Sequence, residues 1–194
     1  MSWGIMFQNM FNKIILTEAF LLKRFYRKHK KLCISSLIGV LFVSTVGCLL
    51  HFVYEWSGRQ FLVGLVTPVS ESTWEHMKLI YFPMLVFFLA EFYFLYRSYP
   101  HLLRADLGGI LTGTLLIPVI FYTYTGIIGS HNLTLDILTF LVSALIGVFV
   151  RCRLLLSEQK KGYTFLYFIC VLVLGACFLI FTYYPPDIGL FAAP

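Results

Sequence analysis

The chain alternates long apolar stretches with short polar ones. Five stretches of 18 to 23 residues are almost free of charged side chains, and about 20 such residues cross the hydrocarbon core of a bilayer as a helix. They are residues 32–54, 79–96, 107–128, 133–150 and 163–184. The pattern therefore predicts an all-α fold, a polytopic membrane bundle of five transmembrane helices.

The composition supports this class. The 194 residues are 59% hydrophobic and only 12% charged, whereas a soluble domain carries about 25% charged residues. We predict a single transmembrane domain over residues 32–194, preceded by a basic cytoplasmic segment, residues 1–31. Apolar residues recur near helical spacing in that segment, which favours an amphipathic helix lying in the membrane interface.

The basic residues predict the orientation. Thirteen of the 15 lysines and arginines lie in residues 1–31, 97–106 and 151–161, which five spans place on one side. Cytoplasmic loops carry the excess of Lys and Arg, so we expect the N-terminus in the cytoplasm and the C-terminus outside. Because these charges flank apolar spans, the expected partner is membrane lipid and not nucleic acid. A membrane-protein partner or a homo-oligomer stays open.

Small residues predict which helices approach closely. Ala105, Gly109 and Gly113 recur every four residues in the third span, and Ser143 and Gly147 repeat the spacing in the fourth. Such a stripe lets two helix backbones come together in a membrane.

Acidic and imidazole groups concentrate at the predicted outer face, where they could hold a divalent metal ion, a proton relay or a cationic ligand. His51 and Glu55 are four residues apart and so share a helix face. The candidate metal ligands are His51, Glu55, Glu71, His76, His131 and Asp136. A purely structural network of hydrogen bonds and ion pairs is the alternative.

The densest polar segment is residues 68–78, directly before the second span. Ser72 and Glu75 fit the S-x-x-E capping box, in which both side chains bond backbone amides of the first helical turn. The candidate catalytic residues are Glu71, Glu75 and His76, as a carboxylate base or as groups around a metal-activated water.

Glu91 is the third feature of interest. It lies six residues before Arg97, about 9 Å inside the cytoplasmic end of its helix. A carboxylate at that depth is costly unless it is paired or protonated, so Glu91 is a functional candidate. The alternative is an ion pair with a basic residue of the cytoplasmic turns.

The segments HFVYEWS (51–57) and VSESTWEHMK (69–78), with Pro83, resemble a family of small integral membrane proteins of Gram-positive bacteria. That family has the motif V-N/S-E-S-x-W-E-H-x-K and no known function. Ser70 stands where the family commonly has Asn. The resemblance implies a multi-pass protein of the bacterial cytoplasmic membrane and no particular activity.

These observations support three functional hypotheses. The first is a non-enzymatic binding, accessory or regulatory component of the envelope, with a polar Glu/His cluster at its outer face. The second is a membrane-embedded enzyme, metal-dependent in one version, acting on a lipid-linked substrate at the outer leaflet. The third is a small transporter or transporter subunit, although no internal repeat supports it.

Overall fold

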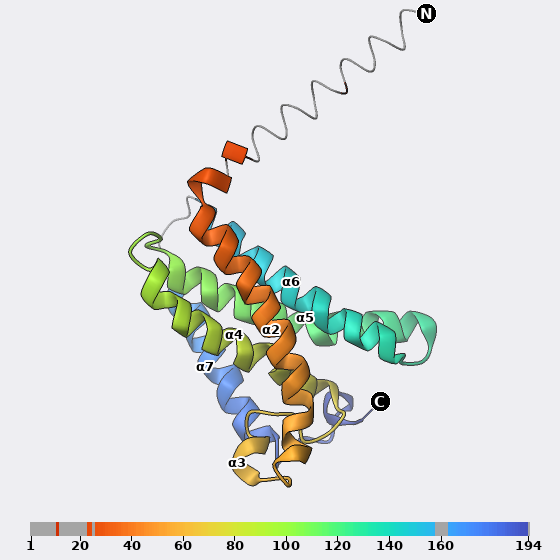
Figure 1. Ribbon diagram of the computed structural model, residues 1–194. Helices are drawn as coiled ribbons and strands as arrows, with labels where there is room; N and C mark the ends of the chain where they lie inside the picture. The colour runs from red at the N-terminus through yellow and green to blue at the C-terminus, as the bar shows by residue number, and fades with distance from the viewer. Residues whose placement is uncertain (1–10, 12–22, 25, 158–162, 194) are drawn as a thin grey trace, which may run out of the picture. The chain divides into compact units, whose positions relative to one another are not determined.

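The structure is a computed structural model that describes residues 11, 23, 24, 26–157 and 163–193. This part of the chain contains six α-helices, one 3-10 helix and no β-strand (Figure 1). The helices are α2 (Lys30–Trp56), α3 (Phe61–Gly64), α4 (Thr73–Leu95), α5 (Leu102–Ile128), α6 (Leu133–Leu156), α7 (Thr164–Phe181) and η1 (Gly189–Phe191).

The chain divides into two compact units, residues 1–35 and residues 36–194. The predicted amphipathic helix of the first unit lies outside the described residues, apart from a few positions, and stays a prediction. The second unit contains most of α2 and all later helices, and with them every candidate site residue.

Five of the helices, α2, α4, α5, α6 and α7, are long and apolar enough to cross a membrane. They coincide with the five predicted spans, and several extend further. α4 begins at Thr73 where the apolar run begins at Leu79, and α6 continues to Leu156, beyond Val150. The additional turns contain charged side chains that pair inside the protein, and helical backbone hydrogen bonds form whether or not a side chain is polar.

Side-chain caps define where two of these helices begin. The Ser72 hydroxyl accepts the N–H of Glu75 at 3.3 Å, which confirms the serine half of the predicted capping box. The Glu75 carboxylate does not return to Ser72. It accepts the N–H of Val69 at 2.8 Å instead and so holds the preceding loop. In α6, the side-chain oxygen of Asn132 accepts the N–H of Thr134 at 2.9 Å.

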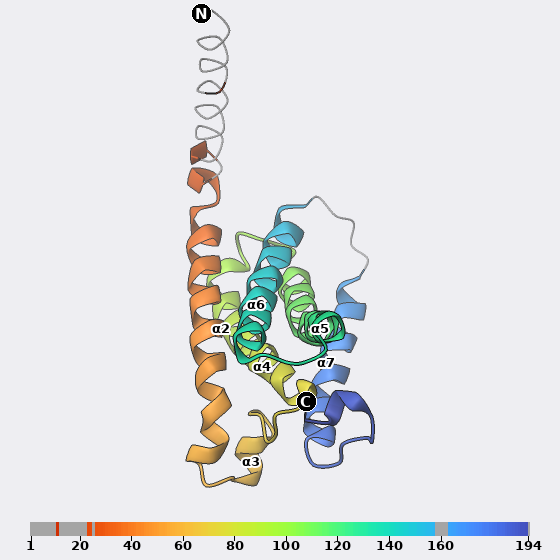
Figure 2. The same cartoon turned by 90° about the vertical axis from the view of Figure 1, so that its right-hand side faces the viewer.

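The predicted small-residue stripe packs α5 against α6, which lie side by side in Figure 1 and Figure 2. A methyl group added to Gly147 would lie 2.9 Å from the carbonyl oxygen of Gly109 and 3.0 Å from the Cα of Gly113. One added to Gly109 would lie 3.0 Å from the carbonyl oxygen of Gly147. The two backbones are therefore close enough that only glycine fits between them.

Gly147→Ala is accordingly expected to lower the free energy of unfolding by about 1–3 kcal/mol, because the new methyl group pushes against backbone atoms. The matched control is Gly126→Ala in α5, where nothing lies within 4 Å of the added Cβ. That change should leave stability unchanged or raise it, since alanine favours the helix. Unfolding of both variants in detergent would measure the difference, and equal effects would contradict the close packing.

The C-terminal tail folds back onto the first turn of α4. The ring of Trp74 lies 4.9 Å from that of Phe191 and 4.7 Å from that of Phe178, centroid to centroid. The Tyr122 hydroxyl donates to the carbonyl oxygen of Gly189 at 3.0 Å. The tail, the end of α5 and the start of α4 therefore meet at one end of the helices, which we call the site end.

Candidate functional site

A buried lysine organises the site end. Lys78 is fully buried, and its ammonium group donates to the carboxylate of Glu75 at 2.8 Å. It also donates to the carbonyl oxygens of Gly64 and Thr67, at 3.0 Å and 3.3 Å, and to the hydroxyl of Thr182. We call the connection between α2 and α4, residues 57–72 with the short α3 inside it, the 57–72 loop. The Lys78 side chain joins this loop to α4 and to Thr182, the residue that follows α7.

Glu75, a candidate catalytic residue, belongs to this structural network. It is 3% exposed, and the same carboxylate oxygen accepts from Lys78 and from the N–H of Val69. A buried ion pair that also satisfies a loop amide is a common way to fix a loop. The geometry therefore favours a positioning role for Glu75.

A cluster of three side chains, His51 of α2, Glu71 of the loop and His76 of α4, lies beside this network. One ligand atom from each can be chosen so that all three lie within 4.8 Å of one another. The Nε2 of His76 is 3.5 Å from one Glu71 oxygen, and the Nε2 of His51 is 3.8 Å from the other. We call these residues the His51–Glu71–His76 cluster.

The orientation of His76 is fixed by its second ring nitrogen. The Nδ1 of His76 lies 2.9 Å from the carbonyl oxygen of Ser72. A carbonyl oxygen only accepts, so Nδ1 carries the proton and, in the neutral ring, Nε2 keeps its lone pair. Metal-binding histidines typically donate their other N–H to a carbonyl or carboxylate in this way. The ring nitrogen that faces Glu71 is thus prepared to bind a cation.

The cluster is accessible. The side chains of His51 and His76 are 30% and 32% exposed, and that of Glu71 is 68% exposed. Two ligand atoms on one tetrahedral zinc are separated by roughly 3.4 Å, given bonds of about 2.0–2.1 Å. The separations of 3.5 Å and 3.8 Å involve different oxygens of Glu71, and one ligand atom from each residue can be taken within 4.8 Å of the others. Side-chain rotation would bring these atoms to the closer spacing of a bound zinc. Three protein ligands would leave a further position open toward solvent.

Three other predicted ligands lie in separate pairs. Glu55 shares a helix with His51, but its carboxylate binds Arg59 at 3.0 Å on the exposed surface. This hydrogen bond raises the pKa of the Arg59 guanidinium. His131 lies 3.5 Å from Asp136, which also accepts from the Tyr124 hydroxyl. Over the described residues, no other set of three histidine, cysteine or acidic side chains converges in this manner.

Glu91 has a buried partner. Arg151 of α6 donates to Glu91 of α4 at 2.7 Å and to Asp106 of α5 at 2.6 Å, and it lies over the ring of Phe88. All three charged residues are less than 7% exposed. The ion-pair alternative predicted for Glu91 is therefore the one observed, and Arg151 joins three helices.

Sequence reasoning missed the roles of Asp106, which it did not single out, and of Arg151, which it counted only among the basic residues of the predicted cytoplasmic turns. A signal was present. Asp106 lies three residues before Gly109, and Arg151 lies four residues after Gly147, so each is on the same helix face as the small-residue stripe. A charged residue on the same helix face as the small residues is directed toward the neighbouring helix.

These features define an all-helical protein with five helices able to span a membrane and with polar clusters inside and at one end of the helix bundle. The chain belongs to DUF6512, a family of unknown function whose model matches residues 22–193. Comparisons with curated proteins and with solved structures found no match.

Proposed function

We propose that this membrane protein binds a divalent transition-metal ion through the His51–Glu71–His76 cluster. One observation carries the proposal: two imidazoles and a carboxylate converge from three segments, and the Nε2 of His76 faces Glu71 while its Nδ1 donates to the carbonyl oxygen of Ser72. The residues of the 69–78 motif therefore have two kinds of role. Ser72, Glu75 and Lys78 build the scaffold, and Glu71 and His76 are the side chains of the motif that belong to the proposed metal site.

Zinc is the first candidate metal. Two histidines, one glutamate and one open position form a ligand set that zinc uses in proteins, and ferrous iron uses the same three ligand types. Calcium and magnesium favour oxygen ligands, so two imidazoles argue against them.

The proposed setting is the bacterial cytoplasmic membrane, with the N-terminus inside. The asymmetry of Lys and Arg supports this orientation, and it persists when buried Arg104 and Arg151 are left out of the count. The cluster would then face the outside, where it would take metal from the extracellular medium. The protein would act as a metal-dependent binding or regulatory component of the envelope.

Metal analysis of the detergent-purified protein tests the proposal. We expect about one zinc ion per chain in the unaltered protein. Glu71→Gln and His76→Ala should each reduce metal affinity by more than about tenfold, because each removes a ligand. Glu55→Gln is the matched control, since Glu55 is an equally exposed carboxylate near the same end and is paired with Arg59.

Each variant would also be checked by thermal unfolding without metal, to separate loss of a ligand from loss of fold. A purified protein that binds neither zinc, iron nor manganese would overturn the proposal. So would equal metal content in all four proteins. The cluster would then be a network of hydrogen bonds and ion pairs only.

A metal-dependent enzyme is the second candidate function. The open coordination position favours it, because such a position lets a metal hold and activate water. Its substrate would be lipid-linked and reached from the outer leaflet. The transporter hypothesis takes Glu91 and the outer carboxylates as marks of a proton or solute path, and it receives less support because Glu91 is buried and bound to Arg151.

A further inference from the structure

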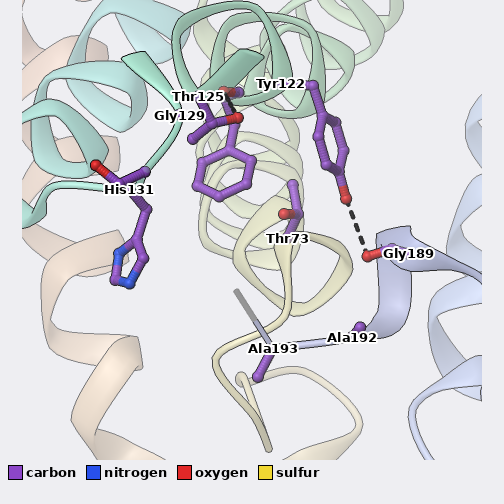
Figure 3. Close-up of a pocket in the computed structure, with 10 residues that line it drawn as sticks. Thr73, Tyr122, Thr125, Gly129, His131, Gly189, Ala192 and Ala193 are labelled. Atoms are coloured by element: carbon purple, nitrogen blue, oxygen red, sulfur yellow. Dashed lines mark hydrogen bonds between the residues drawn. The ribbon is translucent and has the colours of Figure 1, made fainter. Parts of the chain in front are cut away.

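A pocket of about 380 Å³ lies at the site end, between four parts of the chain (Figure 3). Its walls are the start of α4 at Thr73, the end of α5, the turn that follows α5, and the C-terminal tail at Ala192 and Ala193. Tyr122 and Gly189 close one side through their hydrogen bond. The volume is within the range of small-molecule sites. None of the residues of the His51–Glu71–His76 cluster lines this pocket.

Thr73 brings an unpaired hydroxyl into the pocket. The residue is 5% exposed, and Figure 3 shows its hydroxyl on the pocket side, between the end of α5 and the tail. In the described part of the chain, no group accepts from or donates to this hydroxyl. A hydroxyl that has no partner among the described residues and opens onto the pocket can donate to a ligand bound there.

Backbone N–H groups at the start of α4 also lack hydrogen-bond acceptors within the described structure. Thr73 and Trp74 are the first two residues of α4, and their N–H groups have no acceptor among the described residues. The next two N–H groups of the helix are satisfied by Ser72. A helix start that is buried and lacks acceptors attracts anions, because its free N–H groups and its dipole both favour negative charge.

The charges around the pocket permit an anion. Glu75, the acidic residue in the first turn of α4, is neutralised by Lys78. Asp136 is held by Tyr124 and lies 3.5 Å from the imidazole of His131, a pocket residue. No acidic side chain of the described residues lines the pocket itself.

We propose that this pocket binds a phosphate group, with the Thr73 hydroxyl and the first N–H groups of α4 as its donors. Phosphate supplies several strong acceptor oxygens, which matches a site that has donors without acceptors. Two sources offer this group near a membrane, the headgroup of an anionic phospholipid and free inorganic phosphate. The proposal is independent of the metal site, because it shares no residue with the cluster.

The test uses the full chain purified in a phosphate-free maltoside detergent. Short-chain phosphatidylglycerol and inorganic phosphate would be added separately, with retention measured by native mass spectrometry and stabilisation by thermal unfolding. Thr73→Val removes the hydroxyl and keeps the shape of the side chain. Thr123→Val is its control, since the Thr123 hydroxyl is exposed and already donates to the carbonyl oxygen of Val119.

We expect binding of at least one probe to weaken about tenfold in Thr73→Val and to be unchanged in Thr123→Val, as for loss of a hydrogen bond to a charged group. Ala193→Phe, which narrows the pocket from the tail, should weaken the same probe. Phosphatidylglycerol alone would identify a lipid site, and inorganic phosphate would identify a soluble ligand. Absence of both, or equal binding by Thr73→Val and Thr123→Val, would overturn the proposal.

Discussion

Replacing Arg151 by methionine is expected to lower the free energy of unfolding by about 3–5 kcal/mol. The change leaves Glu91 and Asp106 buried without the guanidinium that both carboxylates bind. Two like charges would then face each other inside the helix bundle, where water cannot solvate them. Chemical or thermal unfolding of the purified protein in detergent measures the loss.

Two controls separate charge pairing from packing. Arg153→Met, an exposed position on the same helix, should change stability by less than about 0.5 kcal/mol. The triple variant Arg151→Met, Glu91→Gln, Asp106→Asn removes the charges together and should recover most of the lost stability, because no unpaired charge remains. If Arg151→Met were as stable as Arg153→Met, the buried ion pairs would contribute nothing to the fold.

Lys78→Met is expected to have a similar cost, about 3–5 kcal/mol, because it also breaks a buried ion pair. It leaves Glu75 buried and unpaired, and it frees the carbonyl groups of Gly64 and Thr67 together with Thr182. We expect the 57–72 loop to become sensitive to protease before the helices unfold, since the loop loses the hydrogen bonds that Lys78 donates to its carbonyl groups and keeps weaker attachments such as the bond that the Val69 N–H donates to Glu75. Timed proteolysis with mass spectrometry locates the cuts.

Arg59→Met is the comparison for Lys78→Met. Arg59 belongs to the same loop, and its side chain is 70% exposed in a surface pair with Glu55, which typically contributes less than about 1 kcal/mol. Its variant should keep the proteolysis pattern of the unaltered protein. A Lys78→Met protein with that same pattern would show that the lysine does not hold the loop.

The fold is largely predictable from the sequence because apolar length decides which segments can span a bilayer. The helix ends are less predictable. Two of the predicted spans end beside the charged residues Lys78 and Arg151, but α4 and α6 extend beyond these residues and include them in their helical turns. A charged residue ends an apolar run without ending a helix when it has a partner in the protein, and such partners are up to 104 positions away.

The candidate site is predictable in part. His51, Glu71 and His76 are among the predicted ligands, and the structure brings them together. Glu55 joins that prediction because four residues separate it from His51, and this spacing does place both on one face. However, Arg59 is also four residues from Glu55 and binds it. Local spacing alone does not show which of two neighbours a carboxylate binds.

His131 and Asp136 illustrate a second limit. They share the predicted outer face with the cluster, but they pair with each other and with Tyr124 at the junction of α5 and α6. A sequence assigns residues to a depth in the membrane through hydropathy. It does not give their positions around the bundle, which depend on how the helices pack.

The bond between Lys78 and Thr182 also constrains the order of events during synthesis. These residues are 104 positions apart, so α4 emerges from the ribosome long before its final partner exists. Until the chain has been made to the end of α7, Lys78 has only Glu75 and the nearby loop to bind. The 57–72 loop therefore reaches its mature shape only after α7 has been made, once Thr182 has supplied the remaining acceptor.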